Sequence, residues 1–305
     1  MQNNSILFAA FFSEHRFQKN RIIDDEHIKL WSEIVSAYDK YIAESPRIER
    51  IPKLVHHIWL GSDIPPQYQN FRAKWAELNP EYSLVLWDER MILSLGLHNE
   101  QKFLNAYSYG IKSDIARYEI LYRHGGIYVD TDFEAVRPIP KKLLSFEIVV
   151  GQLSSNRPQF NNALIMATKG SSVMLELVHG IGSIPLSITP EQVLKLTGPD
   201  YLTRVLCARN LLDTDILILP SQYFYPWPSY LLNSSESPLS YCSDSTIALH
   251  HWHMSWFIAP RVKGIRSGLR RLKRTFANVG WAKQYCCHIF RTAFEYIRSA
   301  WRILS

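Results

Sequence analysis

The stretch SDIARYEILYRHGGIYVDTD, residues 113–132, decides the fold. Apolar residues at helical spacing predict a helix with Ser113 as its N-cap, and the pair Gly125–Gly126 ends that helix. The short apolar run that follows is typical of a buried strand. Asp130 and Asp132 then lie at or just past the C-terminal end of the strand, where open α/β sheets bind their ligands.

Two carboxylates one residue apart at the end of a buried strand repel each other unless a cation lies between them. Carboxylates, waters and phosphate oxygens are the ligands that Mg²⁺ and Mn²⁺ prefer, so Asp130 and Asp132 are candidate ligands of one such ion. One opposite-charge contact at about 4 Å is worth on the order of 4 kcal/mol at an effective dielectric constant of about 20. The alternative is a turn in which the aspartates cap backbone amides.

The predicted helix ahead of the strand adds a second acid and a base. Asp114 and Arg117 stand three residues apart, on one face of that helix. A carboxylate and a planar guanidinium suit the hydroxyl groups of a sugar and the phosphates of a leaving diphosphate. A surface ion pair with no further role is the alternative.

Further out, strand-like and helix-like segments alternate. KLVHHIWLG at 53–61 and SLVLWDE at 83–89 are of strand length and rich in β-formers, and residues 67–80 between them have a helical pattern. This βαβ order predicts a parallel sheet covered by helices. Residues 24–44 predict an amphipathic helix ahead of this core.

Composition sets broad limits. The chain has 305 residues, 47% of them hydrophobic, which suits a large core, and its formal net charge is +6. Its four cysteines make no disulfide scaffold, which favours a reducing compartment. No apolar run approaches the roughly 20 residues of a membrane span, and the N-terminus lacks a typical signal peptide. We therefore expect a cytoplasmic protein that is neither secreted nor integral to a membrane.

The C-terminal segment differs in charge from the rest of the chain. Residues 261–305 hold 11 Lys and Arg against the single acid Glu295. Basic residues alternate there with large apolar residues at helical spacing, which predicts helices that lie peripherally on an anionic membrane surface. Packing of these helices on the rest of the chain or on a second subunit is the alternative. Nucleic-acid binding is disfavoured by the many apolar residues.

The order Ser-Asp, Arg three residues on, Gly-Gly, then Tyr-x-Asp-x-Asp resembles the signature of glycosyltransferase family 32, which has a sugar-binding region containing a DXD motif. The family is related to initiating α-1,6-mannosyltransferases and to the catalytic domain of large glucosylating toxins. On either side of the signature, IPKLVHHIWLG, NPEYSLVLWDE, NNALIMA, TGPDYLT and ALHHWHMSW occur in the family's order, within residues 51–256.

The resemblance implies an α/β fold of the GT-A type, the nucleotide-diphospho-sugar transferase fold, with extra N- and C-terminal helices. We accordingly expect an N-terminal helical extension at 1–50, a GT-A catalytic domain at 51–260 and the basic amphipathic tail at 261–305.

The resemblance also implies roles for individual residues. Asp132 is the direct metal ligand, and the closing H-x-x-x-x-S-W motif brings His250 or Ser255 to the metal and the diphosphate. The implied residues are Asp114, Arg117, Asp130 and Asn162 for catalysis, Trp59, Tyr128, Asp130, Ser255 and Trp256 for donor binding, and Asp130, Asp132 and His250 for Mn²⁺ or Mg²⁺.

Three of these residues have plainer explanations. Trp59, which would stack on the nucleotide base, could be a core residue at a strand end. Tyr128 could pack against a helix, and Asn162 could belong to an Asn-Asn turn that enters a strand.

The sequence HHWH, residues 250–253, raises the alternative of a zinc site because it holds three imidazoles. Histidines this close cannot easily all aim at one ion from an extended strand. Which of His250, His251 and His253 faces the metal stays open.

The expected function is metal-dependent transfer of a sugar, with retention of anomeric configuration, from a nucleotide-sugar donor to a glycan or lipid-linked acceptor in capsule or surface polysaccharide synthesis. A UDP-sugar is the favoured donor; GDP-mannose and toxin-like transfer to a protein are the alternatives. A haloacid-dehalogenase-type phosphatase is disfavoured because Glu134 occupies the last position of the D-x-D-x-[TV] pattern. A non-catalytic sugar-binding protein would not need metal and diphosphate ligands together.

Overall fold

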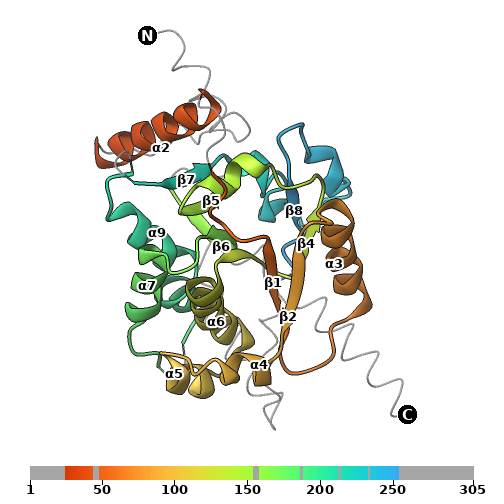
Figure 1. Cartoon of the computed structure of the whole chain (residues 1–305), viewed down its shortest axis with the longest axis vertical. Coiled ribbons are helices and arrows are strands. Elements are labelled where there is room, and N and C mark those ends of the chain that lie inside the picture. The colour runs from red at the N-terminus through yellow and green to blue at the C-terminus, as the bar shows by residue number, and fades with distance from the viewer. Residues whose placement is uncertain are drawn as a thin grey trace. The chain divides into compact units, whose positions relative to one another are not determined.

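A mixed six-stranded sheet with helices on both faces organises the first of two compact units (Figure 1). The computed structural model describes residues 25–43, 48–153, 158–185, 188–211, 214–232 and 234–253. The first unit comprises residues 1–227 and 237–257, and the second comprises residues 228–236 and 258–305. In the second unit the described element is the 3₁₀ helix η4 (Ser229–Leu231).

The elements of the first unit follow in chain order. Its described helices are α2 (Asp25–Ala43), α3 (Pro66–Leu78), α4 (Glu89–Ser94), α5 (Glu100–Asn105), α6 (Tyr109–His124), α7 (Ser172–His179), α8 (Pro190–Leu196) and α9 (Pro199–Cys207). Its described strands are β1 (Leu54–Ile58), β2 (Ser83–Trp87), β3 (Gly126–Val129), β4 (Phe133–Ala135), β5 (Ile148–Gln152), β6 (Phe160–Ala167), β7 (Ile216–Leu219) and β8 (Ala248–His250). The short 3₁₀ helices are η1 (Lys141–Ser145), η3 (Ser221–Tyr223) and η5 (Pro238–Tyr241).

The strand order of the large sheet is β2-β1-β3-β6-β5-β7. β1 pairs in parallel with β2 and β3, and β5 pairs in parallel with β7, but β6 runs antiparallel to both of its neighbours. β5 ends at Gln152 and β6 begins at Phe160, and so short a connection gives antiparallel pairing. The predicted α/β class and βαβ unit are therefore confirmed, while the predicted parallel sheet is corrected to a mostly parallel one.

Two hydrophobic clusters fill the two faces of this sheet. One contains Ile115 of α6, Leu177 of α7 and Leu202 of α9. The other contains Trp75 of α3 and Phe133 of β4, beside the small β4–β8 sheet. Figure 1 accordingly shows α6, α7 and α9 on one side of the sheet and α3 with β4 and β8 on the other.

The amphipathic helix predicted at 24–44 is confirmed as α2. Trp31, Ile34 and Val35 bury its apolar face in the first cluster, and the helix packs on the edge strand β7. The predicted C-terminal helices fall at 261–305, outside the described residues. In the part of the chain that the structure describes, no helix combines the length and the apolarity needed to cross a membrane.

α6 begins earlier than the sequence predicts. Its N-cap is Ser108, whose side-chain oxygen accepts a hydrogen bond from the backbone N–H of Ile111. The prediction of Ser113 as the N-cap is therefore wrong, because Ser108 caps the helix more than a turn upstream. Ser113 lies inside the helix, where its hydroxyl lies 3.0 Å from that of Tyr128.

The turn from α6 to β3 depends on two adjacent glycines with positive φ, +65° at Gly125 and +100° at Gly126. An ideal Cβ on Gly126 would stand 2.6 Å from the carbonyl oxygen of Leu54 in β1. His56 of β1 also bonds here, because its Nε2 lies 2.8 Å from the carbonyl oxygen of Gly125. The backbones of β1 and β3 therefore meet at a distance that excludes a side chain.

His56 fixes this turn as a neutral imidazole. The indole N–H of Trp87 lies 3.2 Å from Nδ1 of His56, and an indole nitrogen only donates. Nδ1 is therefore the acceptor, and Nε2 carries the hydrogen that is donated to Gly125. Burial lowers the pKa of His56 to about 4, which keeps this arrangement at neutral pH.

We expect Gly126→Ala to lower the free energy of unfolding by about 3 kcal/mol, because it adds backbone strain to a clash with the β1 backbone. Gly170→Ala is the matched control, since Gly170 also has a positive φ of +72° but nothing lies within 4 Å of its ideal Cβ. That control should lose only about 1 kcal/mol. Urea unfolding at pH 7 measures both, and equal losses would show that the close approach to β1 does not constrain this turn.

Candidate functional site

Asp130 and Asp132 lie on a tight turn between the two sheets. The N–H of Asp130 donates to the carbonyl of Ala163 in β6 at 2.8 Å, which anchors the start of the turn. The carbonyl of Asp130 accepts from the N–H of Phe133 at 3.2 Å, which closes it. β3 therefore ends in the large sheet, β4 begins in the small one, and both carboxylates stand at the point of change, as the sequence predicts.

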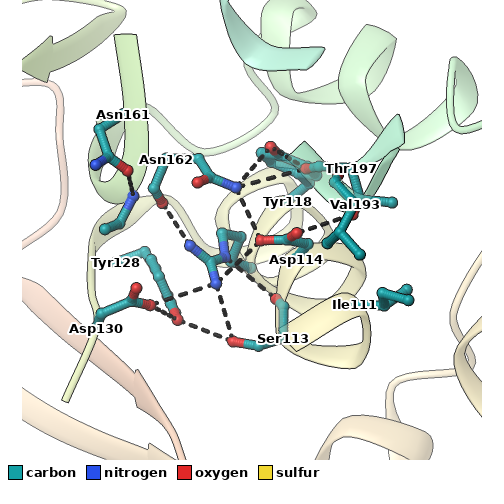
Figure 2. A network of polar contacts seen from close by, with 12 residues as sticks. Ile111, Ser113, Asp114, Tyr118, Tyr128, Asp130, Asn161, Asn162, Val193 and Thr197 are labelled. Carbon is teal, nitrogen blue, oxygen red and sulfur yellow. Dashed lines mark hydrogen bonds and ion pairs between the residues drawn. The ribbon is translucent and has the colours of Figure 1, made fainter. Parts of the chain in front are cut away.

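Arg117 joins the two acids of the site that lie on different elements. Its Nη2 lies 3.2 Å from Oδ1 of Asp114 and 3.3 Å from Oδ1 of Asp130. Figure 2 shows these two acids facing each other from α6 and from the end of β3. Nη1 donates to the carbonyl of Asn162 at 2.7 Å, and Nε donates to the carbonyl of Ser113 at 3.3 Å. The structure thus brings Asp114, Arg117 and Asp130 together, and each of the three guanidinium nitrogens already has a partner.

Tyr128 contacts both Asp130 and Arg117. Its hydroxyl donates to Oδ1 of Asp130 at 2.5 Å, and the guanidinium carbon of Arg117 lies 4.4 Å from the centre of its ring. The side chain is 1% exposed, so the ring is covered in this structure. The ring of Tyr128 packs on α6, as the plainer explanation predicts. Its contact with a nucleotide stays a prediction.

Asp114 is buried among donors. The amide nitrogen of Asn162 donates to Oδ1 at 2.8 Å, and the hydroxyl of Thr197 donates to Oδ2 at 2.8 Å. Burial nevertheless raises the pKa of Asp114, and Arg117 opposes that rise only in part. Asn162 lies within β6, whose first residue is Phe160, so the Asn-Asn turn considered for it is wrong.

Asp132 faces the closing segment of the described chain. Its Oδ1 lies 3.2 Å from Nε2 of His250, and its Oδ2 accepts from the backbone N–H of His253 at 2.9 Å. Burial alone would raise the pKa of Asp132, but the imidazole of His250 and this backbone N–H hold it well below its usual range. Burial raises the pKa of Asp130 instead, and the charge of Asp132 adds to that rise. The two neighbouring carboxyls therefore differ in their ease of ionisation.

The three histidines of residues 250–253 point to different partners. His250 stacks on Phe133 with 4.4 Å between ring centroids, and it is the one beside Asp132. Nε2 of His251 lies 3.0 Å from Oε2 of Glu134, and the ring of His253 lies near Tyr68 of α3. Among the described residues the three-ligand group is Asp130, Asp132 and His250, so the zinc cluster considered for these histidines does not form.

Trp252 makes this divergence possible. It is the single non-glycine residue with a positive φ in the described ranges, at 55°. Its indole N–H donates to the carbonyl of Trp227 at 2.8 Å, which holds the turn. Such a strained residue persists only where its surroundings fix it. Here the turn lets His250 and the backbone of His253 approach Asp132 from the same segment.

Trp59 follows β1 directly and is half-buried. Its indole N–H donates to the carbonyl of Asp63 at 3.1 Å, and its ring lies 5.0 Å from that of Tyr68, measured between centroids. Trp59 belongs to neither hydrophobic cluster described above, which disfavours the core explanation. Its predicted place against the base stays a prediction. Ser255 and Trp256 lie outside the described residues.

Sequence patterns did not indicate the contribution of Thr197. The motif TGPDYLT begins with this residue, but the pattern predicts only a loop and a helix start, which α9 confirms. A threonine at the end of one helix carries no signal that its hydroxyl reaches an acid 83 positions earlier.

The group of Asp130, Asp132 and His250 fits a divalent cation. One ligand atom from each residue lies within 4.8 Å of the others, so a single ion could contact all three. Two carboxylates and an imidazole suit Mn²⁺ well and Mg²⁺ acceptably. Oδ1 of Asp130 is engaged by Tyr128 and Arg117, which leaves Oδ2 as the ligand atom of that carboxylate.

Comparison with known proteins finds similarity over the region that holds Asp114, Asp130 and Asp132. Residues 65–150 match the family model described as glycosyltransferase sugar-binding region containing DXD motif. Inositol phosphoceramide mannosyltransferase 3 of Schizosaccharomyces pombe is 26% identical over 222 residues, which cover 68% of this chain and 62% of the relative. Mannosyl phosphorylinositol ceramide synthase CSH1 of Saccharomyces cerevisiae is 35% identical over 101 residues, 32% of this chain and 27% of the relative. The chain spans less than two thirds of the length of either.

Among solved structures, the catalytic domain of alpha-toxin from Clostridium novyi is similar with a TM-score of 0.46 and 12% identity, over 80% of this chain and 86% of that chain. The predicted resemblance to glycosyltransferase family 32 is confirmed over the region with the DXD motif. The α/β class that the resemblance implies is confirmed by the sheet and its helices.

We expect Asp132→Asn to weaken the binding of Mn²⁺ by at least about tenfold, because the amide removes the ionised ligand that the site keeps at neutral pH. Isothermal titration calorimetry with MnCl₂ measures this at pH 7. Asp244→Asn is the control, since Asp244 is exposed and pairs with Arg137 instead. Unchanged Mn²⁺ affinity in Asp132→Asn would remove Asp132 from the set of ligands.

Proposed function

We propose that this protein transfers a sugar from a nucleotide-sugar donor to a glycan or lipid-linked acceptor, since residues 65–150 match the model of a glycosyltransferase sugar-binding region containing DXD motif. The observation that carries the proposal is the position of Arg117, which joins the buried acid Asp114 to Asp130. Asp130 in turn belongs to the group that fits a divalent cation. A site for sugar hydroxyls and a site for a diphosphate thus adjoin each other.

In this proposal Asp130, Asp132 and His250 hold Mn²⁺ or Mg²⁺. The bound ion supplies electrostatic stabilisation of the negative charge that develops on the leaving nucleoside diphosphate. His250 and the backbone N–H of His253 keep Asp132 ionised, so one charged ligand is ready for the cation. The cation would also favour the ionised form of Asp130, whose pKa burial raises.

Asn162 and Asp114 act on the sugar itself. The amide nitrogen of Asn162 donates to Asp114 and to the hydroxyl of Tyr118, which fixes the orientation of the amide. Among the residues that the structure describes, none donates to the amide oxygen of Asn162, so this oxygen is available to a sugar hydroxyl. Arg117 aligns the two acids rather than contacting the diphosphate, because its nitrogens are occupied by protein acceptors.

The names of the relatives favour a mannosyl donor. Both relatives described above are named for transfer of mannose to inositol-containing ceramides. GDP-mannose therefore becomes the first donor to test, ahead of the UDP-sugars that the sequence alone favours. A lipid-linked acceptor agrees with these names better than a capsule polysaccharide does. Retention of configuration is part of the proposal, with attack from the face that the diphosphate leaves.

We expect purified protein with Mn²⁺ to hydrolyse one nucleotide sugar slowly, and GDP-mannose is the first candidate, followed by UDP-glucose, UDP-galactose and UDP-N-acetylglucosamine. Release of nucleoside diphosphate, followed by chromatography, measures the reaction. EDTA should abolish it, and Asp114→Asn should lower it by at least about a hundredfold while Asp244→Asn leaves it unchanged. A panel with no metal-dependent hydrolysis in wild-type protein would overturn the proposed donor class.

We also propose that the basic tail attaches the protein to an anionic membrane surface, since each Lys or Arg near such a surface contributes about 1 kcal/mol. Full-length protein should sediment with vesicles containing 30% phosphatidylserine (about a third anionic lipid) at low salt and detach at high salt. Deletion of residues 265–305 should abolish sedimentation and leave donor hydrolysis intact. A truncated chain that unfolds, judged by circular dichroism, would assign the tail to the fold instead.

A further inference from the structure

We propose that Thr197 is a positioning residue, whose hydroxyl sets the orientation in which the carboxylate of Asp114 meets the transferred sugar. The inference rests on the proposed function, because it concerns the sugar part of the donor. Thr197 does not touch the donor in this proposal; it acts through Asp114.

The junction between α8 and α9 delivers this hydroxyl. α8 ends at Leu196 and α9 begins at Pro199, so Thr197 and Gly198 alone connect the two helices. The N–H groups of both junction residues donate to the carbonyl of Val193, at 3.0 and 3.1 Å. An ideal Cβ on Gly198 would stand 2.9 Å from the Cα of Leu194, so the junction is too tight for a side chain there. The threonine beside it is fully buried.

Thr197 is fixed from its backbone as well. Its carbonyl accepts a hydrogen bond from the hydroxyl of Tyr118 on α6 at 2.7 Å, and the amide nitrogen of Asn162 on β6 lies 3.5 Å away. Figure 2 shows Tyr118, Asn162 and Thr197 gathered beside Asp114. The hydroxyl of Thr197 therefore has a defined place relative to both α6 and β6.

The two oxygens of Asp114 have different partners. Oδ1 lies 2.8 Å from the amide nitrogen of Asn162 and 3.2 Å from Nη2 of Arg117. In the described chain, Oδ2 accepts only from Thr197, at 2.8 Å. Arg117 contacts Oδ1, and the hydroxyl of Thr197 holds Oδ2. This hydroxyl therefore sets the rotation of the Asp114 carboxylate about its Cβ–Cγ bond.

Loss of that hydroxyl changes how Arg117 is shared between Asp114 and Asp130. A carboxylate free to rotate turns both oxygens toward a guanidinium, because the two-point pair is the stronger one. Arg117 is shared with Asp130 at 3.3 Å, so a closer pair with Asp114 weakens its hold on the turn. The first consequence falls on the sugar, which loses an aligned acceptor. The nucleotide, which has other contacts in the proposal, is affected far less.

The test compares two ligands on three variants. In Thr197→Val the shape is kept and the hydroxyl is lost; in Thr197→Ser the hydroxyl is kept. Thr246→Val is the matched control, because Thr246 is equally buried and its hydroxyl donates to the carbonyl of Gln222, away from Asp114. Titration calorimetry with Mn²⁺ measures the affinity of each protein for the nucleotide sugar that wild-type protein hydrolyses and for the matching nucleoside diphosphate.

We expect Thr197→Val to bind the nucleotide sugar about tenfold more weakly than wild type, and the nucleoside diphosphate within twofold of wild type. Thr197→Ser should restore sugar-dependent affinity to within about twofold, and Thr246→Val should change neither ligand. The ratio of the two affinities separates positioning from stability, because a merely loosened fold lowers both.

Equal weakening for both ligands in Thr197→Val, or an unchanged ratio, would overturn the inference. If Thr197→Val does not fold, Thr197→Ser and Thr197→Cys replace it. Weaker binding of the nucleotide sugar in the cysteine variant, but not in the serine variant, supports the role of the hydroxyl. Unchanged binding of the nucleotide sugar in the cysteine variant overturns the inference. Wild-type protein that binds neither ligand overturns the proposed function itself, which is a separate result.

Discussion

The shared contact of Arg117 with Asp114 and Asp130 is the interaction on which the rest of the site depends. Removing a guanidinium and two carboxylates from water costs several kcal/mol for each ion, and their mutual attraction offsets this only if the remaining donors and acceptors are also paired. The surroundings meet that condition with Ser113, Asn162 and the ring of Tyr128. α6, β3 and β6 are thereby held together at the C-terminal end of β3.

Negative charge is concentrated beyond what this one base compensates. Asp114 lies on α6, and Asp130 and Asp132 lie on the turn after β3. Burial raises the pKa of Asp114 and of Asp130. Asp132 escapes this because His250 and a backbone N–H stabilise its ionised form. A fold does not ordinarily keep such a cluster without a purpose, since replacing buried ionic groups by apolar ones often costs nothing. Strongly shifted pKa values cluster at functional sites, which agrees with the proposed cation site.

Local patterns predicted the parts of the molecule that local chemistry determines. The glycine pair, the short apolar strand and the two aspartates beyond it follow from φ angles, alternation and sheet topology, and each lies where predicted. The N-cap of α6 was misplaced because Ser108 and Ser113 are both acceptable caps, and the choice depends on packing upstream. The partner of Thr197 was beyond local patterns, because this contact joins segments 83 residues apart. The meeting of His250 with Asp132 was implied by the family resemblance alone, and no local pattern indicated it.

The spacing of the signature itself has a geometric cause. From Arg117 to Gly125 the chain advances eight helical residues, about 12 Å along α6 at 1.5 Å per residue. After the glycine turn it returns from Gly126 to Asp130 over four strand residues, about 13 Å at 3.3 Å per residue. The two lengths agree, so the guanidinium of Arg117 and the carboxylate of Asp130 lie side by side. The close approach of Gly126 to β1 fixes the turn from which both lengths are measured. One residue more in the strand would displace the carboxylate by about 3 Å and turn it to the opposite face of the sheet. The interval between the arginine and the first aspartate is therefore a requirement of the helix-strand geometry, to which the chemistry of the site is added.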